Sequence, residues 1–284
     1  MAEILKAAPV VAAMTEELAL RAQACRAAGA APTLVILRVG NKPDDLSYER
    51  GARKRCESVG VDLRVEVLPE DCSQDELLAA IHAINDDESI HGCIMMRPLP
   101  GGFDEHAACQ ALDPAKDVDC MTDGSLMGVF VNNGQGYPPC TAQAVLEMLD
   151  HYGYDLTGAK VTVIGRSLVI GKPVSVMLQA RNATVTMCHT RTKDLASECR
   201  NADIVVVAAG RIGTLRSEHV RAGQTIIDVG INWDEDAGKL AGDVDFASVE
   251  PIVAAISPVP GGVGSVTTAV LAKHVIDAAE RTLC

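Results

Sequence analysis

A short apolar run, followed by a glycine turn and the start of a helix, constrains the fold of this chain more than any other feature. Val161 to Ile164 form a β-branched run that ends at Gly165, and Gly171 and Pro173 follow where a helix is expected to begin. A strand that ends in a tight turn before a helix directs backbone N–H groups and the helix dipole at one place, which suits a bound phosphate. The spacing G-R-S-x-x-x-G differs from the common G-x-G-x-x-G fingerprint, so by itself the stretch also fits an ordinary strand-to-helix turn.

Strand-like and helix-like segments alternate on both sides of this turn. Helices are expected at residues 10–28, 44–59, 140–152, 172–181, 193–200 and 264–282, and from Ser73, which opens a capping box with Glu76. Strands are expected at residues 33–39, 61–68, 92–96, 161–164, 184–188, 203–208, 224–229 and 252–256, and the Pro- and Gly-rich residues 98–139 are predicted to be mostly loop. Such alternation is typical of parallel sheets with right-handed crossovers.

The chain is therefore predicted to be an α/β protein of two domains. A length of 284 residues fits two domains at roughly 150 residues each. We expect a first domain made of residues 1–139 and 267–284, and a second, Rossmann-like dinucleotide-binding domain at residues 140–266. Aromatic residues make up only 3% of the chain, so both cores must consist mainly of Ala, Val, Ile and Leu, as in sheets covered by helices.

Charge and cysteine content exclude several classes of function. The net charge of −13 argues against a nucleic-acid partner or an anionic membrane surface, because both require a basic face. The ten cysteines include no C-x-x-C pair, which favours reduced thiols over a disulfide scaffold or a zinc ribbon. The N-terminus lacks the pattern of a signal peptide and no apolar segment is long enough to cross a membrane, so a soluble cytoplasmic protein is expected.

Polar residues follow the predicted strands of the second half. The runs at 188–192 (C-H-T-R-T) and 230–232 (G-I-N) come directly after strands, and doubly wound sheets bind ligands beyond the carboxyl ends of their strands. The first run stands where an acid normally binds the ribose of NAD. The guanidiniums of Arg166 and Arg191 and the hydroxyl of Thr190 suit a 2′-phosphate instead, which favours NADP, unless these arginines merely face solvent. No metal site is predicted, because the Cys-His pair in this run has no partner ligands at metal spacing.

The run Ser257-Pro-Val-Pro-Gly-Gly-Val-Gly-Ser265 is unusual, with two prolines and three glycines between a predicted strand and a helix. Glycines let a backbone pass close to a ligand, and a purely structural turn would seldom need so many.

Together these motifs resemble the methylenetetrahydrofolate dehydrogenase/cyclohydrolase family. The resemblance covers nearly the whole chain in order, and Pro258-Val-Pro-Gly-Gly-Val-Gly264 is its most specific part. The other matching segments are Val39-Gly…Pro43…Tyr48, Arg97-Pro-Leu-Pro100, Lys116-Asp-Val-Asp119, Pro139-Cys-Thr141, Gly165-Arg-Ser…Gly171-Lys-Pro173, Cys188-His-Thr-Arg-Thr192, Asn201-Ala-Asp-Ile-Val205, Ile227-Asp-Val-Gly-Ile-Asn232 and Gly242-Asp-Val244.

The resemblance implies a two-domain α/β enzyme, usually a homodimer, that binds folate in the cleft between its domains and NADP on the second domain. Tyr48 matches the tyrosine at the reacting centre and Asp119 the aspartate that holds the pterin ring, and these two are the expected catalytic residues. The expected substrate-binding residues are Tyr48, Leu99, Asp119, Pro260, Gly261 and Gly262. Gly165, Arg166, Ser167, Thr190 and Ile231 match cofactor-contacting positions, and with Gly171 and Arg191 they form the predicted cofactor site.

The sequence departs from the family's pattern where the cyclohydrolase step is carried out. The family's Y-x-x-x-K motif reads Tyr48-Glu-Arg-Gly-Ala52, so alanine replaces its lysine. Its V-Q-L-P-L-P motif reads Met95-Met-Arg-Pro-Leu-Pro100, so Met96 stands where a glutamine assists that lysine. Further departures are Cys120 in place of a glycine, and Ala142 and Ser265 in place of prolines.

Hydride removal from methylene-tetrahydrofolate needs orientation but no general base, whereas hydrolysis of the methenyl cation needs a positioned, deprotonated water. We therefore predict an NADP-dependent methylenetetrahydrofolate dehydrogenase with weak or absent cyclohydrolase activity. The nearby basic residues Lys54, Arg55 and Arg97 are expected to be solvated surface charges rather than substitutes for the lysine.

Three other readings stay open. Another group could replace the lysine and keep the enzyme bifunctional. Met96 and Arg97 could reshape the pocket for a modified folate or another one-carbon carrier. The chain could also be a catalytically silent paralogue that binds NADP or folate and regulates a partner.

Overall fold

The computed structural model describes residues 1–235 and 237–283, which form two compact units. The early unit comprises Ala13–Cys140 and Thr268–Cys284, and the late unit comprises Met1–Ala12 and Thr141–Thr267. The sequence assigned residues 1–12 to the first domain, but they group with the late unit. The reason is a pairing between distant segments: β1 (Glu3–Ile4) lies parallel to β11 (Ala255–Ile256) at the edge of the late sheet.

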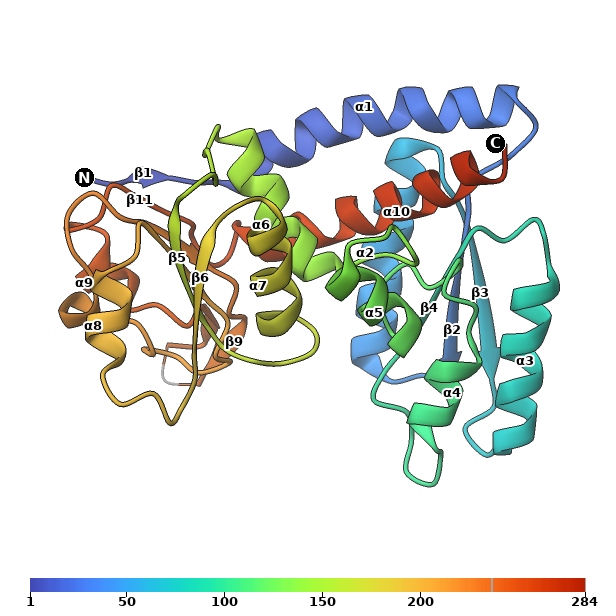
Figure 1. Ribbon diagram of the computed structural model, residues 1–284. Helices are drawn as coiled ribbons and strands as arrows, with labels where there is room; N and C mark the ends of the chain where they lie inside the picture. The colour runs from blue at the N-terminus through green and yellow to red at the C-terminus, as the bar shows by residue number, and fades with distance from the viewer. Residues whose placement is uncertain (236, 284) are drawn as a thin grey trace. The chain divides into compact units, whose positions relative to one another are not determined.

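The late unit is built on a six-stranded, entirely parallel sheet in the order β1-β11-β8-β7-β5-β6. Its other strands are β5 (Lys160–Ile164), β6 (Thr184–Cys188), β7 (Ile204–Val207) and β8 (Thr225–Asp228). Its helices are α6 (Cys140–His151), α7 (Gly171–Ala180), α8 (Leu195–Arg200) and α9 (Phe246–Val249), and α7 and α8 lie beside β5 and β6 in Figure 1. Every residue of β7 and β8 is buried, as expected for parallel strands in the centre of a sheet.

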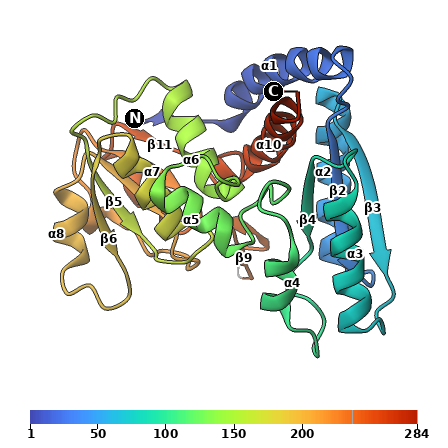
Figure 2. The ribbon, with the colours of Figure 1, turned by 45° about the vertical axis from the view of Figure 1, so that its right-hand side comes forward.

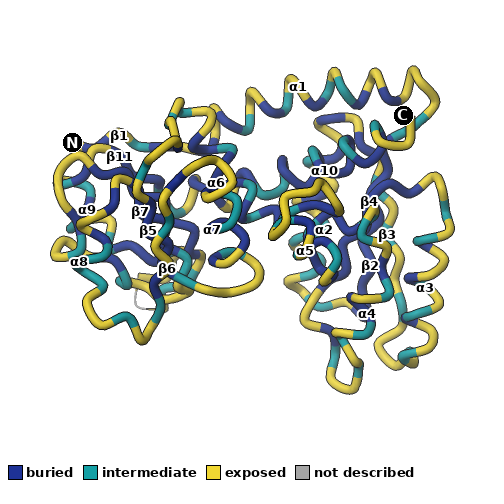
Figure 3. The backbone as a smooth tube through the Cα atoms, viewed as in Figure 1, coloured by how far each residue is buried: buried dark blue, intermediate teal, exposed yellow. Residues whose placement is uncertain are grey.

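The early unit contains a three-stranded parallel sheet in the order β3-β2-β4. These strands are β2 (Thr33–Val39), β3 (Asp62–Leu68) and β4 (Gly92–Met95), and α2 (Pro43–Val59) and α3 (Gln74–Asp86) lie on either side of them (Figures 1 and 2). Leu77, Ile81 and Ile84 of α3 pack on β2 and β4. The long helix α1 (Ala7–Ala27) alternates buried and exposed residues along its length (Figure 3), and Arg21 on α1 forms ion pairs with Asp277 and Glu280 on α10 (Thr267–Arg281).

Most of the predicted elements are present, but the prediction of loop across residues 98–139 is wrong in part. This segment contains α4 (Glu105–Ala111) and α5 (Asp123–Val131). The side chains of Asp104 and Thr122 cap their first turns. Glycine lowered the helical signal, yet Gly128 serves close packing: an added Cβ would lie 2.0 Å from the Gln135 carbonyl oxygen. The sequence also did not predict the hairpin of β9 (Asn232–Asp234) and β10 (Lys239–Ala241).

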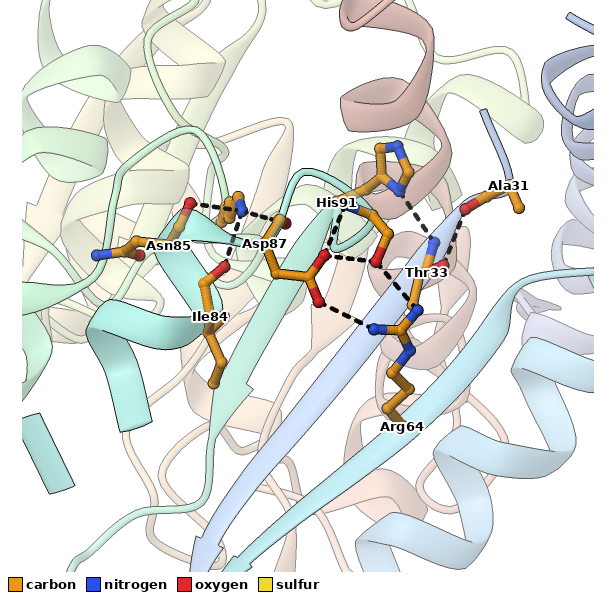
Figure 4. Close-up of polar contacts among 9 residues, drawn as sticks. Ala31, Thr33, Arg64, Ile84, Asn85, Asp87 and His91 are labelled. Carbon is orange, nitrogen blue, oxygen red and sulfur yellow. Dashed lines mark hydrogen bonds and ion pairs between the residues drawn. The ribbon is translucent and has the colours of Figure 1, made fainter. Parts of the chain in front are cut away.

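The C-terminal end of α3 is closed by a lysine that lies 30 residues further along the chain. Figure 4 labels the three residues at this end of the helix, Ile84, Asn85 and Asp87. Lys116 Nζ donates hydrogen bonds of 2.8 Å to the carbonyl oxygens of Ile84, Asn85 and Asp87. A cation at this end of a helix satisfies carbonyl groups that have no intrahelical partner and interacts favourably with the helix dipole. Arg64 Nη1 donates to the Asp87 carboxylate on the same side, 3.1 Å away.

We expect Lys116→Met to lower the free energy of unfolding of the early unit by about 2 kcal/mol, because three carbonyls lose a charged donor in a half-buried site. Urea denaturation followed by circular dichroism measures this. Lys54→Met, at an exposed position of α2, is the control and should change the midpoint little. Equal midpoints for the two variants would contradict the assigned role of Lys116.

Candidate active site

The order in which the chain adds strands to the late sheet reverses at β5, which has β6 on one side and β7 on the other. Chains that leave the carboxyl ends of these strands diverge and open a crevice, where doubly wound sheets bind ligands. A cavity of about 580 Å³ lies at this position. It is lined by Ile164, Gly165, Arg166, Ser167, His189, Thr190, Leu195, Ala208, Ala209, Arg211, Ile212, Gly213, Thr214 and Arg216.

Close backbone packing explains the two glycines of the turn after β5. Gly165 has φ of 131°, and an added Cβ would lie 2.2 Å from the Ala208 carbonyl oxygen. A Cβ on Gly171 would lie 2.3 Å from the Gly165 carbonyl oxygen. Ser167 Oγ accepts a hydrogen bond from the Ile170 N–H, whereas Ile170 itself provides no side-chain cap for α7. Of the first three residues of α7, Lys172 donates its N–H to the Ser167 carbonyl oxygen at 3.0 Å and Pro173 has no N–H, so the Gly171 N–H is the one that remains for an anion.

The structure brings together only part of the predicted cofactor site. Gly165, Arg166, Ser167 and Thr190 line the cavity, and Gly171 lies behind the turn. Arg191 is exposed and does not line the cavity; its backbone N–H donates to Nδ1 of His189. Arg211 and Arg216, which the sequence analysis did not single out, line the cavity from the segment after β7. Their signal was the run Ala209-Gly210-Arg211 directly after the predicted strand 203–208.

A second cavity of about 200 Å³ in the late unit contains the remaining predicted residues of that unit. Ile231, Pro260, Gly261 and Gly262 all line it. A Cβ on Gly262 would lie 2.3 Å from the Pro258 carbonyl oxygen, so the glycine permits the tight path of this loop. The Ile231 side chain is 60% exposed, which leaves it free to contact a ligand.

Two buried carboxylates hold the loops around both cavities. Asp243 Oδ2 accepts from the N–H groups of Ala209 and Gly210, and its Oδ1 accepts from the Arg211 N–H and from Asn232 Nδ2. All four distances lie between 2.6 and 2.9 Å. Asp243 thereby fixes the start of the segment that carries Arg211 and Arg216.

Asp228, at the end of β8, forms the second part of this network. Its carboxylate accepts from the N–H groups of Gly230, Asp243 and Val244, each at 3.0 Å. Burial raises the pKa of Asp228 to about 6, although these N–H groups act in the opposite direction. A Cβ on Gly242 would lie 1.9 Å from Asp228 Oδ2, so only glycine lets the chain approach this carboxylate.

The early unit places Tyr48 and Asp119 in one neighbourhood. Asp119 Oδ1 accepts from the Cys140 N–H at 3.0 Å, and burial raises the pKa of this carboxyl. Burial also raises the pKa of Tyr48 well above its usual value, and the negative charge of Asp119 adds to the shift. The two side chains are thus close enough to interact electrostatically, as the family resemblance requires of a shared site.

The two positions that lack the family's polar residues are apolar and buried. Ala52 lies on α2, one turn after Tyr48, and is 1% exposed. Met96 follows β4 directly and is 8% exposed. These side chains have no acid–base chemistry to offer a substrate.

None of the three nearby basic residues is placed as a plain substitute for the missing lysine. Lys54 is exposed, and Arg97 is exposed with Nη1 3.9 Å from Cys109 Sγ. Arg55 differs from the expected surface charge: it is half-buried, donates to Thr15 Oγ1, and burial lowers its pKa. Its guanidinium is still a poor proton acceptor.

Leu99 and Cys120, which the sequence analysis also named, both lie in the early unit. Leu99 is 9% exposed and belongs to the core cluster of the early unit, and its N–H donates to Glu105 Oε2. Cys120, where the family has glycine, has φ of 60° in the left-handed region that favours glycine. The buried Asp117 carboxylate accepts from Met121 N–H and Thr122 N–H and so holds this segment.

Within residues 1–235 and 237–283, no group of three or more His, Cys, Asp or Glu residues is arranged to hold a metal ion. In the same residues no helix has both the length and the apolar character needed to span a bilayer.

Comparison with known families identifies both parts of the chain. Residues 5–119 match the catalytic domain of tetrahydrofolate dehydrogenase/cyclohydrolase. Residues 139–283 match the NAD(P)-binding domain of the same family.

Individual relatives agree along their whole lengths. The "Bifunctional protein FolD" of Carboxydothermus hydrogenoformans is 50% identical over 281 residues, which cover 99% of this chain and 98% of the relative. The structure of the bifunctional FolD methylenetetrahydrofolate dehydrogenase/cyclohydrolase of Campylobacter jejuni superposes with a TM-score of 0.95 at 36% identity, covering 99% of this chain and all of that one. The Trypanosoma brucei enzyme, solved with NADP and an inhibitor, gives a TM-score of 0.90 at 33% identity and covers 99% of this chain and 98% of its own. This chain therefore belongs to the tetrahydrofolate dehydrogenase/cyclohydrolase family.

Proposed function

We propose that this protein oxidises 5,10-methylene-tetrahydrofolate to 5,10-methenyl-tetrahydrofolate with NADP, and that its cyclohydrolase activity is weak or absent. The observation that carries the proposal is the contrast between the two units. The late unit has an arginine-lined cavity at the strand ends that suits an anion. The early unit, in contrast, has the buried, apolar residues Ala52 and Met96 where the family has lysine and glutamine.

The oxidation needs no proton acceptor from the protein. Hydride leaves a carbon that is held between two nitrogens, and their lone pairs delocalise the positive charge that remains. A bound nicotinamide supplies the hydride acceptor. The protein's own task is to hold the substrate in the reacting geometry, and Asp119 and Tyr48 are the residues we assign to it.

The hydrolysis makes a different demand. Water must attack the methenyl carbon and give up a proton, and then the carbon–nitrogen bond must break toward the formyl product. A lysine with a lowered pKa is suited to accept that proton. A methyl group at position 52 cannot do so, and Met96 cannot hold a lysine in place by hydrogen bonding.

NADP is the cofactor that the late unit favours. The turn between β5 and α7 offers backbone N–H groups to a pyrophosphate, and the cavity beside it is lined by arginines rather than by an acid that would bind a ribose 2′-hydroxyl. The NADP-bound relative from Trypanosoma brucei supports this assignment.

For the folate we propose contacts with Tyr48, Leu99 and Asp119 of the early unit and with the loop 260–262 of the late unit. These residues lie within the ranges 5–119 and 139–283, which match the two domains of the family. We also propose a cytoplasmic homodimer. All nine cysteines that the structure describes are free, which fits a reducing compartment. Light scattering should give twice the chain mass, and the mass of a single chain would contradict the dimer.

A specific observation favours one alternative, a bifunctional enzyme with a different proton acceptor. Lys42 Nζ donates to the Pro98 carbonyl oxygen at 2.6 Å, so this lysine reaches the same segment as Met96 and Leu99. The names of the relatives, which describe bifunctional proteins, also favour this alternative. A pocket reshaped for another one-carbon carrier and a catalytically silent binding protein are outcomes that the assays below would reveal.

With methylene-tetrahydrofolate and NADP, we expect cofactor reduction and accumulation of the methenyl product, because the oxidation outpaces hydrolysis. Absorbance spectra that resolve NADPH and the methenyl species measure both steps. Ala52→Lys with Met96→Gln should increase methenyl hydrolysis at least tenfold, since general base catalysis contributes about 10²–10⁴-fold.

Ala52→Met with Met96→Gln is the matched control, because it adds a similar side-chain length without an amine. Hydrolysis by the unaltered protein as fast as its oxidation step would overturn the loss of cyclohydrolase activity. Loss of that hydrolysis in Lys42→Met would then identify Lys42 as the acting group. Binding of both ligands without turnover would indicate a silent paralogue.

We expect Asp119→Ala to raise the KM for the folate substrate roughly tenfold or more, because a charge-assisted hydrogen bond to the pterin ring is lost. Binding of 2′,5′-ADP, which reports on the late unit alone, should be unchanged. A melting curve controls for the lost Cys140–Asp119 hydrogen bond. An unaltered KM in a stably folded variant would remove Asp119 from the substrate site.

A further inference from the structure

We propose that discrimination between NADP and NAD depends on Arg211 and Arg216, which act with Arg166 on the 2′-phosphate, rather than on Arg191. This inference rests on the proposed binding of NADP and extends it to residues of the segment after β7.

The first argument is charge. The chain carries a net charge of −13, yet the cavity at the β5 switch point is lined by three arginines and, among the described residues, by no aspartate or glutamate. A cavity with three guanidiniums and no carboxylate attracts a dianionic group. The backbone N–H groups of the β5–α7 turn already serve the pyrophosphate, so the arginines remain for a further phosphate.

The second argument is that these guanidiniums are available. Several other arginines have their charge compensated by an ion pair with an aspartate or glutamate. These are Arg21, Arg26, Arg38, Arg53, Arg64, Arg181 and Arg221. Within the described part of the chain, Arg166, Arg211 and Arg216 have no carboxylate partner. Arg216 Nε donates to the Gly213 carbonyl oxygen at 2.9 Å, which leaves its terminal nitrogens for a ligand.

The third argument is preorganisation. The Arg211 N–H donates to the buried Asp243 carboxylate at 2.8 Å, and the Thr214 hydroxyl donates to the Arg211 carbonyl oxygen at 2.7 Å. The Arg216 N–H donates to His219 Nδ1 at 3.1 Å. The segment is thus anchored at both ends, and two long side chains start from fixed backbone positions. A fixed origin lowers the entropy lost when they bind a phosphate.

Arg191 differs from these three arginines in position. It follows β6, where the 2′-phosphate ligand is expected from the sequence, but it does not line the cavity.

The test compares 2′,5′-ADP, which carries the 2′-phosphate, with 5′-AMP, which lacks it, by isothermal titration calorimetry on the full chain. We expect tighter binding of 2′,5′-ADP by the wild type. Arg211→Gln and Arg216→Gln should each weaken 2′,5′-ADP binding roughly tenfold and leave 5′-AMP binding within about twofold. In the oxidation assay, the KM for NADP should rise relative to the KM for NAD in both variants.

Lys193→Gln is the control, because it removes an exposed positive charge close in sequence to the β6 end that does not line the cavity. Unchanged discrimination in both arginine variants would overturn the proposal, as would loss of discrimination in Arg191→Gln alone. Equal affinity of the wild type for the two nucleotides would overturn it too. Discrimination lost as expected in a protein that does not oxidise methylene-tetrahydrofolate would instead refute the proposed reaction and leave this inference intact.

Discussion

The arrangement of the late unit depends on a pair of buried carboxylates. Asp228 and Asp243 are 3% and 0% exposed, and between them they accept hydrogen bonds from backbone N–H groups in three separate loops. A buried carboxylate is costly unless its oxygens are satisfied, so each loop must stay where its N–H group can reach one. The result is a rigid rim at the strand ends, and both cavities of this unit are lined by segments that the rim holds.

This rim explains how an acidic protein can present a positive pocket. The carboxylates point inward and are occupied by N–H groups, so their charge is compensated within the protein. Arg166, Arg211 and Arg216 are exposed and line the cavity at the strand ends. Local placement of charge, and not the net value of −13, therefore decides which ligand this surface accepts.

The residues of the early unit that depart from the family pattern differ in their burial and in their backbone conformation. Ala52 and Met96 are buried within the core of the early unit, where the family has polar side chains. Cys120 is different, because a non-glycine residue with φ of 60° carries some backbone strain, which the hydrogen bonds of Asp117 to the adjacent residues help to sustain. Cys120 directly follows Asp119, so this strained residue lies next to the proposed substrate site.

Much of the fold followed from sequence alone, because β-branched runs and capping signals are local. The predicted strands at 33–39 and 184–188 have the observed bounds, and the Ser73–Glu76 capping box is present. The helix α5 did not follow, since its glycines, which are placed for close packing, resemble loop residues. The helix α4 contains no glycine, but it is only seven residues long and lies within the Pro- and Gly-rich segment. The position of β1 did not follow either, because its pairing joins the two ends of the chain.

The features of the site can likewise be separated into those that the sequence determined and those that only the tertiary structure decided. The sequence by itself determined the family, the two α/β domains, the glycine turn that suits a phosphate, and the absence of a lysine at position 52 and a glutamine at position 96. Only the tertiary structure decided which arginines face the cavity, because that depends on how Asp243 draws the segment after β7 toward the strand ends. Local patterns specify what each strand and turn can bind, whereas contacts between distant loops determine which side chains meet at one place.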